Sequence, residues 1–142
     1  MAQALEQPAI QVVPVPRNDL QAWLSAEHHI ERSIGRATHW NLDDVLHQYI
    51  DGKVQLTLIY EKDNLIGAMV SEIICYPRKK VLFIHGISVG PGHDMTWFNE
   101  TWAQVQGLAR ANGCETVSAS GRVGWLRQMP GARSLNVWEV EI

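Results

Sequence analysis

Three strand-like segments, joined by short polar turns, occupy the middle of the chain and narrow the available folds more than any other feature. They are Val54–Tyr60, Leu65–Tyr76 and Val81–Val89. The first alternates apolar and polar residues, and the third is almost wholly apolar, which is typical of a strand in the centre of a sheet. Because the turns are short, the three segments predict an antiparallel meander, with Gly67 as a candidate bulge.

An amphipathic helix is predicted directly after the meander. Gly90-Pro91-Gly92 ends the sheet, and from Asp94 onward apolar residues recur at steps of three and four, at Met95, Phe98, Trp102, Val105 and Ala109. Asn112-Gly113 is typical of a helix C-terminus. The strand Thr116–Ala119 follows, so the helix is a crossover, and a crossover usually joins parallel neighbours.

Shorter elements flank this central unit. Ile10–Val15 predicts a strand, and Asn18–Gly35 a helix whose cap is Asn18 or Asp19. Asn41–Gly52 predicts a second helix. After Ala119 we expect a short helix over 123–129 and a closing strand over 135–142.

Length and charge exclude several classes of protein. The 142 residues suit one domain, residues 10–142, after a loose tail over 1–9. A net charge of −3 gives no overall positive field, so neither nucleic acid nor a membrane is expected as a partner. The first ten residues lack the pattern of a signal peptide, which favours the cytoplasm. For Cys75 and Cys114 it favours free thiols that are buried. No metal-binding motif is present, so no metal site is predicted.

The predicted order is β-α-α-β-β-β-α-β-α-β, an α+β fold with a mixed, mostly antiparallel sheet. Further local features are the turn Gly90–Gly92 and the C-terminal segments Ala109–Cys114, Gly121–Trp125 and Met129–Ala132. Over nearly its whole length the chain resembles the GNAT (Gcn5-related N-acetyltransferase) superfamily. The C-terminal segments resemble small GNAT-like proteins encoded in bacteriophage genomes.

This resemblance implies a binding site for acetyl-CoA at the end of the meander. In GNAT proteins the fourth and fifth strands separate, the pantetheine pairs with the exposed strand edge, and amides at the next helix start hold the pyrophosphate. By resemblance the strand edge maps to Ile87, Ser88 and Val89. The phosphate turn maps to the segment that holds Gly90, Gly92, His93 and Asp94. Arg122 either reaches a ligand phosphate or pairs with an acidic residue of the preceding helix.

The turn departs from the usual GNAT pattern in two respects. Pro91 removes one amide donor, and Asp94 places a carboxylate near the expected phosphates. In addition, no Lys or Arg lies between Lys80 and Arg110.

Candidate catalytic groups are the polar residues inside the apolar strands, Glu72 and His85. Transfer of an acetyl group to an amine needs a base, and a desolvated Glu or a His suits that role. The competing interpretation places Glu72 in solvent and makes His85 a hydrogen-bonded core residue.

Two functions follow as hypotheses. The first is an acyltransferase that moves an acetyl group from acetyl-CoA to the amine of a small molecule or a protein. The second is an inactive GNAT-fold phage protein that acts in virion assembly, in the host cytoplasm or in the virion. Homodimerisation and binding to phage structural proteins are both left open.

Overall fold

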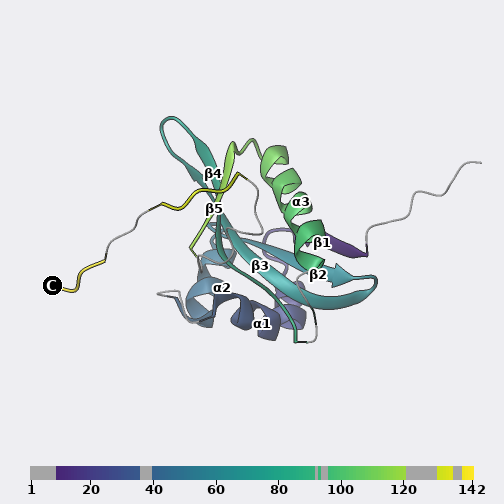
Figure 1. Ribbon diagram of the computed structural model, residues 1–142. Coiled ribbons are helices and arrows are strands. Elements are labelled where there is room, and N and C mark those ends of the chain that lie inside the picture. The colour runs from purple at the N-terminus through teal and green to yellow at the C-terminus, as the bar shows by residue number, and fades with distance from the viewer. Residues whose placement is uncertain (1–8, 36–39, 92, 94–95, 121–130, 136–138) are drawn as a thin grey trace, which may run out of the picture.

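The computed structural model describes residues 9–35, 40–91, 93, 96–120, 131–135 and 139–142 (Figure 1). Its elements, in chain order, are β1 (Ile10–Pro14), α1 (Leu20–Ile34), α2 (Leu42–Ile50), β2 (Gln55–Glu61), β3 (Asn64–Cys75), β4 (Lys80–Val89), α3 (Thr96–Ala111) and β5 (Thr116–Ala119). This order confirms the first eight predicted elements. The predicted helix over 123–129 lies outside the described residues.

The five strands form one sheet in the order β1-β2-β3-β4-β5. The first three pairings are antiparallel, and β5 runs parallel to β4. Helices α1 and α2 lie on one face of the sheet and α3 lies on the other (Figure 1). The α+β class, the meander and the parallel crossover are therefore confirmed.

The chain after β5 differs from the predicted closing strand. Of the segment 135–142, the described residues are Leu135 and 139–142, and none of them belongs to the sheet. The side chains of Leu135 and Val140 are exposed. Alternating apolar residues form a strand only when a neighbouring strand is placed to pair with them, so the pattern alone was not sufficient here.

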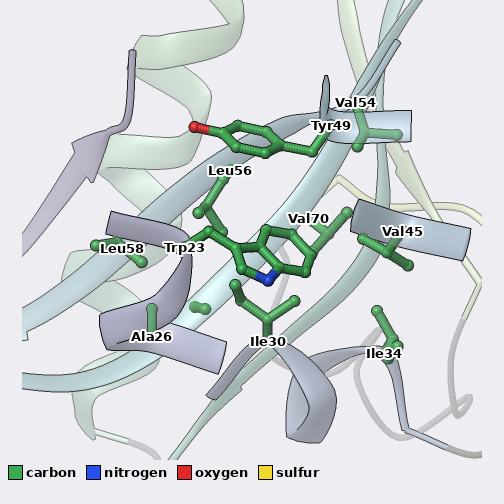
Figure 2. Packing of buried hydrophobic residues seen from close by; sticks show 11 residues of the cluster. Trp23, Ala26, Ile30, Ile34, Val45, Tyr49, Val54, Leu56, Leu58 and Val70 are labelled. Carbon is green, nitrogen blue, oxygen red and sulfur yellow. The ribbon is translucent and has the colours of Figure 1, made fainter. Parts of the chain in front are cut away.

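The core between the sheet and α1 and α2 is organised around a pair of aromatic rings (Figure 2). Trp23 of α1 stacks on Tyr49 of α2 with ring centroids 5.6 Å apart. The Tyr49 hydroxyl donates to Pro16 O at 2.8 Å and accepts from Asp19 N at 2.9 Å. Asp19 in turn caps α1, because its side chain accepts from Ala22 N. Tyr49 therefore fixes the start of α1 against α2.

We expect Y49F to lower the free energy of unfolding by about 1–2 kcal/mol, because the Pro16 carbonyl and the Asp19 amide lose their partner while the ring stays in place. Urea unfolding measures the change. The matched control is Y76F, because Tyr76 is exposed. Equal effects of the two substitutions would contradict this role of the hydroxyl.

Helix α3 also protects the free edge of the sheet. Glu100 Oε2 accepts from Ile10 N at 2.8 Å, and Gln104 Oε1 accepts from Val12 N at 2.8 Å. The Gln104 amide returns a hydrogen bond to Ile10 O at 2.7 Å. These side chains satisfy backbone groups of the edge strand β1 that another chain could otherwise use for pairing.

A buried histidine on α1 makes the stability of the fold sensitive to pH. Burial lowers the pKa of His29, and the neighbouring positive charges of His28 and Arg32 lower it further. Its Nδ1 atom is buried without a hydrogen-bond partner among the described residues. As the pH falls below about 6.5, His29 is therefore protonated in the unfolded chain before it is protonated in the folded protein.

We expect the free energy of unfolding to fall as the pH drops below about 6.5 and through the lowered pKa of His29. The measurement is urea unfolding at pH 7.5 and at successively lower pH values. H29Q should remove the contribution of His29 to the dependence of the free energy of unfolding on pH. H47Q, which changes an exposed histidine on α2, should leave that dependence unchanged. If the free energy of unfolding of H29Q depended on pH as strongly as that of the wild type, His29 would not be the residue responsible.

Candidate functional site

Strands β4 and β5 stay paired over only part of β4. The parallel register runs from Val81 opposite Thr116 to Ile84 opposite Ala119. Beyond Ile84, the remaining half of β4 keeps its antiparallel pairing with β3. On the β5 side, no described residue pairs with the segment from His85 to Val89. In the described part of the chain, an unpaired strand edge therefore begins at His85.

His85 lies at a bulge in β4. Ile84 pairs with Ser71 and Gly86 pairs with Val70, so His85 is the extra residue between them. A bulge re-aims the side chain that it carries. His85 Nε2 lies 2.9 Å from Glu72 Oε1, on the neighbouring strand β3. The side chains are 17% and 33% exposed, respectively, so the pair is sheltered but reachable from solvent.

Two aromatic rings enclose the histidine. The centroid of the Trp40 ring lies 4.5 Å from that of His85, and the Phe83 ring lies 5.0 Å away in an edge-on arrangement. Trp40 precedes α2, far from His85 in the sequence. The contact of Trp40 with His85 could not be predicted from the sequence, because a lone tryptophan next to a helix cap carries no sign of its distant neighbour.

A surface pocket of about 490 Å³ lies beside this cluster and shares Trp40 with it. Its walls come from the end of α1, the residues before α2 and the first turn of α2. The lining residues are Glu31, Ile34, Gly35, Trp40, Asn41, Leu42 and Asp43. With two carboxylates and an aromatic ring, the pocket has the chemistry that suits a cation.

The predicted strand-edge residues, Ile87, Ser88 and Val89, do not all lie on the same face of the sheet. Ile87 and Val89 pack against the core on the α3 side. A Cβ atom on Gly86 would lie 2.1 Å from Ser33 O, so α1 packs directly against the other face of β4. Near this contact, Ser88 Oγ is buried and has no hydrogen-bond partner among the described residues.

The first amide of the predicted phosphate turn, that of Gly90, forms a hydrogen bond within the protein. Gly90 N donates to Ile66 O at 2.7 Å. His93 Nδ1 lies 3.1 Å from Gly90 O, and His93 Nε2 lies 3.8 Å from Glu61 Oε1. Of the other predicted binding residues, Gly92, Asp94 and Arg122 lie outside the described part of the chain.

A search of the described residues for three or more His, Cys, Asp or Glu side chains placed to hold a metal ion finds no such group. In the same part of the chain no helix has the length and apolar character that crossing a membrane requires. Both cysteines are free thiols, as predicted. The predicted burial is confirmed for Cys114 and wrong for Cys75, which is exposed at the last residue of β3.

No protein-family model and no curated protein matches the sequence. Solved structures do match the fold over almost the whole chain. An aminoglycoside acetyltransferase from an uncultured soil metagenomic sample, in complex with sisomicin, is 12% identical with a TM-score of 0.67, covering 94% of this chain and 96% of its own. The chain has the GNAT acetyltransferase fold.

Two further structures show the same GNAT fold. The ribosomal-protein-alanine N-acetyltransferase from Brucella melitensis biovar Abortus 2308 is 12% identical with a TM-score of 0.66, covering 94% of this chain and 99% of its own. Aminoglycoside N-acetyltransferase AAC(6')-Iy in complex with CoA is 14% identical with a TM-score of 0.64, covering 99% and 98%. At this identity the likeness establishes the fold, and the chemistry must be argued from the site.

Proposed function

We propose that the protein transfers an acetyl group from acetyl-CoA to an amine. The observation that carries this proposal is the position of the His85–Glu72 pair. The pair lies where the pairing of β4 with β5 ends, next to the edge of β4 that no described residue pairs with. A titratable pair at such an edge brings a proton acceptor close to a ligand that pairs with the strand.

The residues at this edge fit an acyl-CoA. Among the described residues, none pairs with the β5 side of the segment from His85 to Val89, and an amide-containing chain such as pantetheine could pair there. The buried Ser88 hydroxyl has hydrogen-bonding capacity that no described residue uses.

His85 is the proposed general base. When Nε2 carries the proton and donates to Glu72, the lone pair of Nδ1 is free to accept a proton from the amine. Glu72 fixes the ring and stabilises the imidazolium that results, so it is a positioning residue. Acetyl-CoA supplies a thioester carbon for the amine nitrogen to attack. An ammonium group first gives one proton to His85, which frees the nitrogen lone pair for the attack. As the C–N bond forms and the C–S bond breaks, the nitrogen loses a second proton to the departing sulfur, so CoA leaves as the thiol.

The proposed acceptor is a cationic amine. Glu31 and Asp43 line the pocket beside Trp40, and Trp40 lies between that pocket and His85. Carboxylates attract an ammonium group, and an indole face binds it through the π system. Two of the structural relatives described above are named as aminoglycoside acetyltransferases, so aminoglycosides and simple polyamines are the first acceptors to test.

The direct test is turnover. Purified protein is mixed with acetyl-CoA and a panel of amines, namely sisomicin, spermidine and an N-terminal alanine peptide, and release of the CoA thiol is followed. We expect release that depends on the amine, with a mass increase of one acetyl group on the acceptor. If the protein bound acetyl-CoA but transferred no acetyl group to any of these amines, the proposed transferase activity would be contradicted and only a role in binding would remain.

An inactive GNAT-fold protein of a phage virion is the alternative hypothesis. One observation favours it: Gly90 N–H is bonded to Ile66, and Pro91 has no N–H, so the start of the predicted phosphate turn offers few free amides. Purified virions that contain the chain, combined with a protein that fails to bind acetyl-CoA, are the result that this hypothesis predicts.

A further inference from the structure

His85 is restrained by its backbone and by one hydrogen bond, and neither of these fixes the plane of its ring. Its Nε2 atom lies 2.9 Å from Glu72 Oε1. The backbone of the next residue is fixed by α1, because a Cβ atom on Gly86 would lie 2.1 Å from Ser33 O. The χ2 torsion of a histidine has a broad range, so the imidazole can still turn about its Cβ–Cγ bond. A further contact is needed to hold the ring in one orientation.

The ring of Trp40 makes such a contact. Its centroid lies 4.5 Å from that of His85, and the two ring planes are inclined by 35°. The ring of Phe83 adds a second contact at 5.0 Å, with the planes inclined by 68°. Because the two aromatic rings meet the imidazole at different inclinations, together they limit the turning of the imidazole.

Trp40 is itself held in place by the start of α2. Its partly buried side chain packs against the core between the sheet and the helices α1 and α2. The next residue, Asn41, belongs to a capping box, in which Asp44 N donates to Asn41 Oδ1 and Asn41 N donates to Asp44 Oδ2, both at 2.9 Å. The capping box fixes the backbone directly after Trp40. The tryptophan therefore meets His85 from a rigid part of the fold.

The indole ring also suits the charge that His85 carries during transfer. Once His85 has accepted a proton from the ammonium group, it is an imidazolium beside the Glu72 carboxylate. An aromatic ring close to a cation stabilises that cation, and the effect grows as water is excluded. The His85 side chain is only 17% exposed, so water screens this interaction only in part.

We propose that Trp40 is a positioning residue for the proton transfer, which fixes the plane of the His85 ring and stabilises its charged form. This inference rests on the proposed function, in which His85 is the general base. It is separate from the binding of the acceptor at the pocket side of Trp40, since the two roles affect different kinetic constants. Loss of positioning lowers kcat, whereas loss of acceptor binding raises the KM for the amine.

The first test compares the steady-state kinetics of W40L and W40F with those of the wild type. W40L keeps an apolar side chain but has no flat ring, whereas W40F keeps a flat ring. We expect W40L to lower kcat about 5- to 30-fold and W40F to lower it less, with the KM for acetyl-CoA unchanged in both. Equal losses of kcat in W40L and W40F, or a change in the KM for the amine alone, would overturn the inference.

A double-mutant cycle with H85A shows whether Trp40 acts through His85. If it does, H85A/W40L should have the same residual kcat as H85A, because the group that Trp40 positions is already absent. If W40L lowered kcat in the H85A background as strongly as in the wild type, Trp40 would act on the substrate or on the fold, and the inference would be wrong.

Nuclear magnetic resonance of histidine-labelled protein measures the contact without turnover. In the wild type the indole ring current shifts the resonances of the His85 ring protons, and W40L should remove this shift. Unchanged resonances in W40L would overturn the inference. If the wild type transfers no acetyl group to any amine, the proposed function fails and the positioning role fails with it. If the wild type is active and W40L keeps its kcat, only the positioning role fails.

Discussion

H85A is expected to lower kcat for acetyl transfer by about 100- to 10,000-fold, because the variant lacks the group that accepts the proton of the amine. The KM for acetyl-CoA should change little, since the pairing edge of β4 is backbone. Initial rates of CoA release at saturating acetyl-CoA and amine measure the effect. H28A, which removes an exposed histidine of α1, is the matched control and should keep full activity.

A substitution of Glu72 tests the same site with a smaller expected loss of kcat. E72Q keeps the shape of the side chain and its ability to accept from His85 Nε2, but it removes the charge that stabilises the imidazolium. We expect a loss of kcat smaller than that of H85A, with the KM for acetyl-CoA unchanged. Normal kcat in H85A would contradict the assignment of the base. A rise in KM with unchanged kcat would instead indicate that the pair only binds substrate.

G86A is expected to have the largest effect on stability. A Cβ atom on Gly86 would lie 2.1 Å from Ser33 O and 2.6 Å from Ser33 C, and both atoms are backbone at the end of α1. Because these atoms cannot rotate away, either α1 or β4 must shift. We expect a loss of about 3 kcal/mol or more in the free energy of unfolding, and a fall in the melting temperature of about 10 °C.

The chain offers a matched control for this prediction. Gly107 lies in α3, and a Cβ atom there would meet nothing within 4 Å. Since alanine is favoured over glycine inside a helix, G107A should raise the free energy of unfolding by about 1 kcal/mol. Thermal and urea unfolding of both variants gives the comparison. A G86A protein as stable as wild type would mean that α1 does not contact β4 as described.

Local patterns were sufficient to predict most of the fold. Alternation and short turns predicted β2 to β4, and the caps at Asp19 and Asn41 predicted α1 and α2. The buried face of α3 was predicted less completely. Trp97 and Thr101 are buried on that helix, whereas Trp102 is only partly buried. Burial there depends on the contact with β1, which periodicity alone does not contain.

The candidate site was predicted only in part. Glu72 and His85 were recognisable because polar residues interrupt apolar strands, and the register of β3 and β4 places them in contact. Trp40 comes from a segment distant in sequence, and only the packing of the helices on the sheet brings it to β4. Tertiary contacts of this kind leave no local pattern in a single sequence.

Isothermal titration of the wild-type protein with acetyl-CoA tests the central claim most directly. We expect saturable one-to-one binding with a Kd between about 1 μM and 1 mM, the usual range of enzyme substrates. We also expect weaker binding at higher salt, because salt screens any contact with the phosphates of the cofactor. No heat and no thermal shift at millimolar acetyl-CoA would contradict it.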